Sequence, residues 1–130
     1  MTVLVDTSVW IEYLERSNPL VEEPLDDLLL RGVVVSAGLV IAELRHGCRT
    51  RDQLGVLLEA MQPLPYLEAN RDDWLRAGEL AAAGALRGRR LEIGDCLLAA
   101  LASREECLIF TLDRDFDHIP GVKLYRVRTH

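Results

Sequence analysis

The sequence lacks any long apolar run, and this excludes a membrane-spanning helix, which needs about 20 consecutive apolar residues. The N-terminus has no basic segment followed by an apolar stretch, so we find no secretory signal and expect a cytoplasmic protein. Cysteines are few and scattered. Cys48, Cys96 and Cys107 show no paired spacing, which favours reduced thiols over disulfides or a zinc site.

Positive charge is also in short supply, because 15 Lys and Arg residues face 21 Asp and Glu residues and give a net charge of −6. This balance argues against binding nucleic acid by bulk electrostatic attraction. It leaves room for a local acidic site that attracts phosphate only after divalent cations bind. Glycine-rich nucleotide-binding motifs are missing as well. A chain of 130 residues with 49% hydrophobic residues can form one domain with its own core, and we expect residues 1–130 to do so.

What the sequence does have is an apolar run, Val3–Val5, that ends on the carboxylate of Asp6. Such a run is typical of a strand buried on both faces, and binding sites form outside the carboxyl ends of strands in open α/β sheets. Apolar runs alternate with helical patterns along the whole chain, which predicts an α/β fold: a single α/β/α sandwich with a central parallel, Rossmann-like sheet. We expect strands at 3–5, 33–35, 66–67, 108–110 and 123–127, and helices at 8–16, 20–31, 37–48, 50–61, 71–87 and 93–104, with Ser36 capping the third helix and Asn70 the fifth.

Four acids stand at unexpected positions. Asp6 and Asp113 each follow a buried strand, Glu43 borders the apolar face of its helix, and Asp95 opens a nearly all-apolar helix. Each has an ordinary explanation as a cap, a solvated side chain or a turn residue. Together they are predicted near one edge of the sheet, where clustered carboxylates repel one another. A hard divalent ion with oxygen ligands, Mg²⁺ or Mn²⁺, would offset this repulsion.

The sequence does not match three other known types of acidic site. A calcium loop starting at Asp113 would need glycine and glutamate where His118 and Leu124 stand. A haloacid dehalogenase phosphatase needs a second aspartate at the position of Ser8, and a receiver domain needs adjacent acids near Asp6. A non-catalytic interaction domain on the same fold stays open as an alternative.

These residues form motifs with a known counterpart. The chain resembles the PIN-domain ribonucleases, specifically the VapC-type toxins of toxin–antitoxin pairs, in Val5-Asp6-Thr7-Ser8-Val9-Trp10-Ile11, Ala42-Glu43-Leu44, Asp95-Cys96-Leu97-Leu98-Ala99-Ala100 and Thr111-Leu112-Asp113-Arg114-Asp115-Phe116. The resemblance covers essentially the whole chain. A housekeeping PIN-type nuclease for RNA processing is the alternative within this family.

The resemblance implies a PIN-like sandwich and Mg²⁺-dependent cleavage of RNA that leaves a 5′-phosphate and a 3′-hydroxyl. It assigns the catalytic and metal-binding quartet to Asp6, Glu43, Asp95 and Asp113. Ser8 and Thr111 would support the site by hydrogen bonding, and Asp115 would share or take over the fourth acidic role. Candidate contacts to the RNA backbone are Arg45, Arg87 and Arg89, with ordinary surface charge as the alternative.

The first helix carries more apolar side chains than one sheet contact requires. Trp10, Ile11, Tyr13 and Leu14 predict a groove, shared with the second helix and the helix of Glu43, for an apolar segment of a cognate antitoxin. Under this hypothesis Trp10 is partly exposed in the free protein; under the alternative the core uses it fully. The resemblance also implies a homodimer through a separate face.

Overall fold

The computed structural model describes residues 1–127 and has a central sheet of four parallel strands in the order β3-β2-β1-β4. The strands are β1 (Val3–Val5), β2 (Val34–Ala37), β3 (Tyr66–Leu67) and β4 (Leu108–Phe110). In the middle of the sheet Leu4 lies opposite Val35 on one side and Ile109 on the other. All three are buried, because helices cover both faces of the sheet, and this explains why β1 is wholly apolar.

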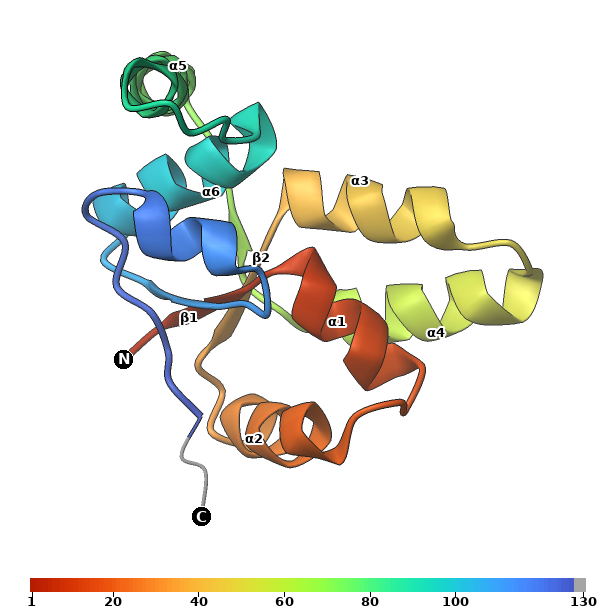
Figure 1. Ribbon diagram of the computed structural model, residues 1–130. Helices are drawn as coiled ribbons and strands as arrows, with labels where there is room; N and C mark the ends of the chain where they lie inside the picture. Colours follow the sequence, from red (N-terminus) through yellow and green to blue (C-terminus); the bar gives the residue numbers. More distant parts are fainter. Residues whose placement is uncertain (128–130) are drawn as a thin grey trace.

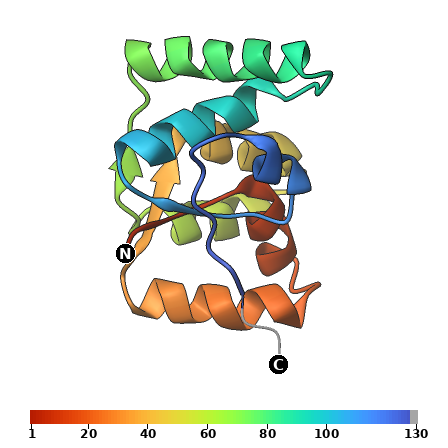
Figure 2. The same ribbon diagram turned by 60° about the vertical axis from the view of Figure 1, so that its left-hand side comes forward.

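Six α-helices connect and cover the strands: α1 (Thr7–Leu14), α2 (Pro19–Leu30), α3 (Gly38–Gly47), α4 (Arg51–Met61), α5 (Arg71–Leu86) and α6 (Ile93–Arg104). The chain moves outward from β1 to β3 and then returns past β1 to β4, so right-handed crossovers place the later helices on the opposite face. Figure 2 shows α5 and α6 above the sheet and α2 below it. In Figure 1, α3 and α4 run antiparallel and project beyond the sheet. Within residues 1–127, every helix is too short or too polar to cross a membrane.

The predicted α/β/α sandwich with a parallel sheet is confirmed, and most predicted elements differ from the observed ones by one or two residues. The predicted cap at Ser36 is wrong. Ser36 belongs to β2, where its backbone N–H and its hydroxyl both donate to the carbonyl of Pro65, and Ala37 precedes α3. The predicted strand at 123–127 is reduced to a bridge between Leu124 and Ile109, because only Ile109 of β4 exchanges backbone hydrogen bonds with this segment, through Lys123 and Tyr125.

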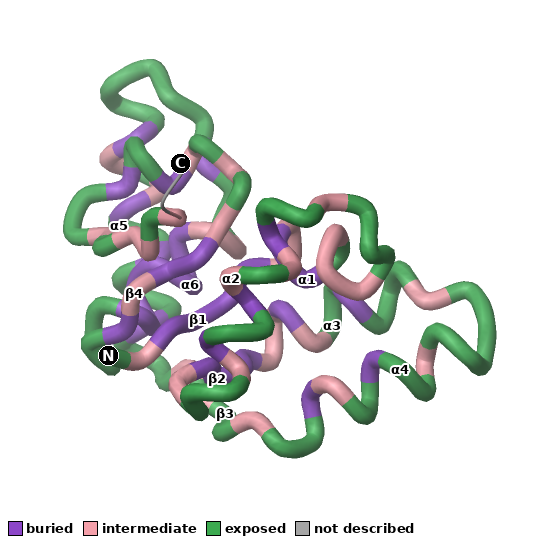
Figure 3. The backbone as a smooth tube through the Cα atoms, turned by 90° about the horizontal axis from the view of Figure 1, so that it is seen from below, coloured by how far each residue is buried: buried purple, intermediate pink, exposed green. Residues whose placement is uncertain are grey.

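Trp10 lies in the core, and the prediction that it is partly exposed is wrong, since its exposed fraction is 0%. The core cluster around it combines residues of the sheet with Leu25 and Leu28 of α2. Its ring also meets the edge of Tyr13, with 5.7 Å between centroids. Helix α1 therefore packs against two partners, and its surplus of apolar side chains is partly used inside the protein. The tube in Figure 3 shows the buried backbone concentrated along the central strands and α6.

Candidate metal centre and adjoining groove

Asp6 directly follows β1, the strand that has β2 on one side and the later strand β4 on the other. The backbone N–H of Asp6 donates to the carbonyl of Phe110 at the end of β4, over 2.9 Å. The chain builds β2 and β3 on one side of β1 and β4 on the other, so this point is the topological switch of the sheet. Ligands of open α/β sheets bind at such a point. Asp6 as a whole residue is 6% exposed, a degree of burial unusual for an aspartate.

Two hydroxyl groups hold the Asp6 carboxylate. The Oγ atom of Ser8 donates to Oδ2 over 2.9 Å, and the Oγ1 atom of Thr111 donates to the same oxygen over 2.8 Å. Thr111 Oγ1 in turn accepts the backbone N–H of Asp113 over 2.9 Å. The side chain of Asp6 makes no capping bond to α1, although Asp6 precedes that helix. Within residues 1–127, no donor is found for its Oδ1 atom, which leaves this oxygen available to a cation.

Three further carboxylates converge in a group that does not include Asp6, although Asp6 is near enough for its charge to raise the pKa of Asp95. Asp95, Asp113 and Asp115 each offer an oxygen, and these oxygens lie within 4.8 Å of one another. Asp95 is in the first turn of α6. Asp113 precedes the 3-10 helix η1 (Arg114–His118), and its Oδ1 accepts the backbone N–H of Asp115 over 2.9 Å. That short turn brings both acids to the same place, so Asp113 and Asp115 are both positioned for the fourth acidic role.

Glu43 approaches this cluster from α3 on its exposed side. Its Oε1 atom accepts a hydrogen bond from Thr7 Oγ1 over 2.8 Å, which links Glu43 to the residue directly after Asp6. Thr7 is a site residue that was not predicted, and its position between Asp6 and Ser8 is the only indication of this role in the sequence.

The five acids form a strongly repulsive group. Burial raises the pKa of Asp95 most, the charges of Asp6, Asp113, Glu43 and Asp115 add to this in that order, and together these causes bring the pKa to about 7. Within residues 1–127, none of the ion pairs includes any of these five side chains. A group of carboxylate oxygens without a cationic partner fits a hard divalent ion such as Mg²⁺. The cluster can therefore hold a metal with the residues that are present.

The arginines predicted to contact RNA lie at different places. Arg87 donates from Nη2 to the carbonyl of His118 over 3.3 Å, so the loop after α5 lies against η1, which carries Asp115. Arg89 is exposed in the same loop. Arg45 is exposed on α3, and because it follows Glu43 by two residues it projects from another face of the helix. Of the three predicted arginines, Arg87 is thus the one for which the structure shows a contact with η1.

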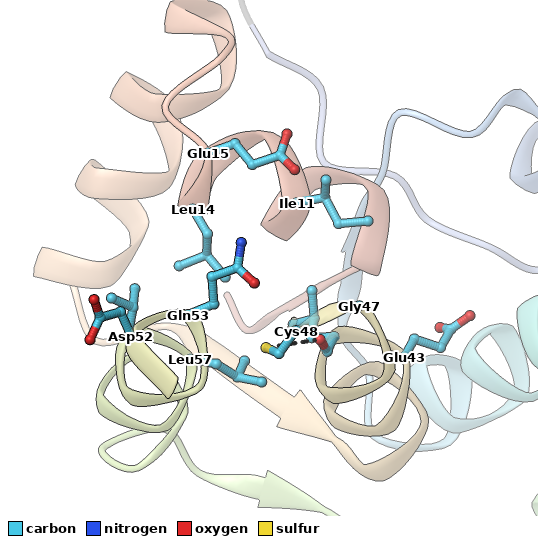
Figure 4. A pocket seen from close by; sticks show the side chains of 11 residues that line it. Ile11, Leu14, Glu15, Glu43, Gly47, Cys48, Asp52, Gln53 and Leu57 are labelled. Carbon is cyan, nitrogen blue, oxygen red and sulfur yellow. Dashed lines mark hydrogen bonds between the residues drawn. The ribbon is translucent and has the colours of Figure 1, made fainter. Parts of the chain in front are cut away.

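An apolar groove of about 400 Å³ adjoins the cluster, with Glu43 at one end (Figure 4). Its walls come from α1, α3 and α4, and they contain Ile11, Leu14, Glu15, Glu43, Leu44, Gly47, Cys48, Asp52, Gln53, Val56 and Leu57. Its charged lining residues, Glu15, Glu43 and Asp52, are all acidic. Ile11 and Leu14 were predicted to line such a groove. The second helix was predicted as a wall, and this is wrong, because Leu25 and Leu28 of α2 are buried in the core and α4 takes that place.

Tyr13 contacts α2 and does not contribute to the groove. Its hydroxyl donates to a carboxylate oxygen of Asp26 on α2, and the guanidinium of Arg16 lies over its ring, 5.1 Å from the centroid. Burial and the bond to Asp26 raise the pKa of Tyr13 to about 12. Tyr13 therefore ties α1 to α2, and it does not line the groove.

Comparison with known proteins identifies the family. The sequence profile described as PIN domain matches residues 3–122. The chain is 31% identical over 128 residues to VapC ribonuclease Mb1587 of Mycobacterium bovis and, to the same extent, to ribonuclease VapC11 of Mycobacterium tuberculosis, with 92% of each chain covered.

Solved structures agree with this match. A VapBC2 complex of Rickettsia felis bound to a promoter DNA fragment contains a chain with the same fold, at a TM-score of 0.82 and 19% identity, covering 96% of this chain and 98% of the other. The VapBC-5 complex of Mycobacterium tuberculosis gives a TM-score of 0.68 at 26% identity, with 98% and 100% covered. The chain accordingly belongs to the PIN-domain family and, within it, to the VapC ribonucleases.

Proposed function

We propose that this protein is a metal-dependent endoribonuclease that hydrolyses RNA phosphodiester bonds at its acidic cluster, and that it is the toxin of a toxin–antitoxin pair. The observation that carries the proposal is the group of five acids at the switch point of the sheet, which have no cationic partner among residues 1–127. It occurs in a chain whose 31% identical relatives are named ribonucleases.

The chemistry follows from the positions of the acids. A bound Mg²⁺, or Mn²⁺ in its place, neutralises phosphate charge and lowers the pKa of water. Asp6 would be the central ligand, because Ser8 and Thr111 fix its carboxylate and leave Oδ1 available. Asp95, Asp113 and Asp115 would complete the oxygen ligands. Glu43 would act as the general base and accept the proton of the attacking water, because it is exposed to solvent and its carboxylate is oriented by the hydrogen bond from Thr7.

The chemical ends of the products test the reaction type. With Mg²⁺ present, purified protein should cut single-stranded RNA into fragments with a 5′-phosphate and a 3′-hydroxyl, because water attacks the phosphorus and the ribose 2′-hydroxyl takes no part. The ends are measured by ligation and by mass spectrometry of the fragments. Products with a 2′,3′-cyclic phosphate would overturn the proposal, since they arise from attack by the 2′-hydroxyl.

We further propose that the groove binds an amphipathic segment of a cognate antitoxin. The solved relatives are complexes of toxin with antitoxin. The floor of the groove is apolar and its charged residues are acidic, so the matching segment is apolar on one face and basic at its edges. A basic residue near Glu43 would also compete with the metal. This groove favours a toxin over a housekeeping nuclease, and a homodimer through another face remains a prediction.

Filling the groove should weaken this complex. Gly47 lines it, and a Cβ added there would meet nothing within 4 Å, so Gly47→Leu places a side chain in the groove without strain. We expect the dissociation constant for the antitoxin encoded in the adjoining reading frame to rise more than about tenfold, as for a residue at the centre of an interface. Calorimetric titration measures it.

The matched control is Gly55→Leu on α4. A Cβ at Gly55 also meets nothing within 4 Å, but Gly55 does not line the groove. This variant should bind the antitoxin as tightly as the unmodified protein. Equal weakening by both variants, or by neither, would place the antitoxin elsewhere.

A further inference from the structure

A second cavity, of about 370 Å³, lies on the other side of α3 from the groove. It is bounded by the first turns of α3 and α5, the end of β3 and the middle of α6; these helices surround the upper part of the molecule in Figure 1. Neither the acidic cluster nor the groove accounts for it. Two aromatic side chains line it while remaining exposed to solvent, Tyr66 at 55% and Trp74 at 53%.

The aromatic lining is built into the fold. Gly38 at the start of α3 allows Tyr66 to lie against the helix, because a Cβ at that position would be only 2.8 Å from the tyrosine hydroxyl oxygen. Trp74 stands in the first turn of α5, which the capping box of Asn70 and Asp73 fixes. Exposed aromatic faces of this kind stack with unpaired nucleobases, and the stacking tolerates any base.

The cavity shares helices α3 and α6 with the acidic cluster. Leu39 lines the cavity and also lies against Gly94, where a Cβ would be 3.0 Å from a Leu39 methyl carbon. Gly94 directly precedes Asp95. Ala42 lines the same cavity and directly precedes Glu43. The cavity wall is therefore built from the helix turns that also carry two of the five acids.

Charge decides which part of a nucleotide fits. Within the part of the chain that the structure describes, Glu68 is the only charged residue that lines the cavity. Its carboxylate repels a phosphate, whereas it can accept hydrogen bonds from the N–H groups of a base. The cavity therefore suits the uncharged base of a nucleotide better than its phosphate.

We propose that this cavity is a subsite for an unpaired nucleobase of the RNA strand, adjoining the phosphodiester that is cut. The inference rests on the proposed nuclease function and adds the part of the substrate that is held. Trp74 is its main binding residue, and Tyr66 provides a second aromatic surface.

Tryptophan fluorescence gives a direct readout, because the other tryptophan, Trp10, is fully buried. We expect a short unstructured RNA, added to Asp6→Asn protein so that no cleavage occurs, to quench the emission in a saturable way. The quenching should be lost in the Asp6→Asn, Trp74→Phe double variant. Leu75→Ala is the matched control, since Leu75 is an exposed neighbour on α5 that does not line the cavity.

Kinetics on otherwise unmodified protein provide the second readout. Trp74→Ala should raise KM for RNA roughly tenfold, the effect of losing one stacked base, and change kcat much less. Trp74→Phe should recover most of the loss, and Leu75→Ala should show none. Unchanged unfolding temperatures in these variants would establish that the fold is kept.

Two results would overturn the inference. The first is RNA cleavage by unmodified protein with no quenching of Trp74 and no rise in KM for Trp74→Ala. The second is emission that changes with protein concentration in the absence of RNA, together with a Trp74→Ala variant that becomes monomeric, because a second copy of the chain then covers the cavity. If unmodified protein cuts no RNA, the proposed function fails, and quenching in the Asp6→Asn protein still decides whether bases bind.

Discussion

Asp6→Asn is expected to lower the rate of RNA cleavage about a hundredfold to a thousandfold, because a charged metal ligand contributes several kcal/mol to stabilising the transition state. The asparagine oxygen can still accept the hydrogen bonds that Ser8 and Thr111 donate to Asp6 in the unmodified protein. The variant should therefore fold and lose only charge. Initial rates of cleavage at saturating Mg²⁺ measure the effect.

The same substitution should leave the metal-free protein at least as stable. Burial, and after it the charges of Asp6 and the neighbouring acids, raise the pKa of Asp95 to about 7, so removing the charge of Asp6 moves this pKa back towards its ordinary value. Asp72→Asn, a neutralised exposed acid on α5 outside the cluster, serves as the control and should cut RNA at the unmodified rate. Cleavage by Asp6→Asn at that same rate would show that Asp6 is not a metal ligand.

Trp10→Ala is expected to lower the free energy of unfolding by about 3–5 kcal/mol, the usual cost of truncating a fully buried tryptophan. Domains of this size have only about 5–15 kcal/mol in total, so the variant should unfold at a much lower urea concentration. The Nε1 atom of Trp10 has no hydrogen-bond partner within residues 1–127. The side chain therefore stabilises the fold by packing, and Trp10→Phe should cost less than Trp10→Ala.

Trp74→Ala is the matched comparison for stability. Trp74 is 53% exposed, against 0% for Trp10, and its truncation should cost less than about 1 kcal/mol. Urea unfolding followed by circular dichroism compares the two. A Trp10→Ala protein as stable as Trp74→Ala would contradict the burial described for α1.

The sequence predicted the positions of the acids because strand ends are visible in it. A short apolar run followed by an aspartate identifies both Asp6 and Asp113, and the parallel sheet then brings them together. The hydrogen bonds that hold Asp6 depend on side-chain orientation. The resemblance indicated Ser8 and Thr111 as supporting residues, but no local pattern indicates that Thr7 reaches Glu43.

Two of the errors, the exposure of Trp10 and the wall of the groove, have a common physical origin, since they concern which side of a helix the core uses. The apolar residues of α1 were correctly identified, but α2 packs against α1 and Trp10 is part of the shared core, and no pattern within α1 indicates this. The wall of the groove comes from α4, whose Val56 is 50% exposed and looks like an ordinary surface residue in the sequence. The sequence likewise does not indicate that Trp74 lines a cavity, because another wall comes from α3, which is distant in the sequence.

The metal requirement of RNA cleavage tests the central claim most directly. Protein treated with EDTA and then freed of chelator should cut RNA only after Mg²⁺ or Mn²⁺ is added, because without a divalent ion the five acids repel the phosphate. Added Mg²⁺ should also raise the unfolding temperature of the same sample, since it binds the folded state. Cleavage that continues undiminished in excess EDTA would contradict the account.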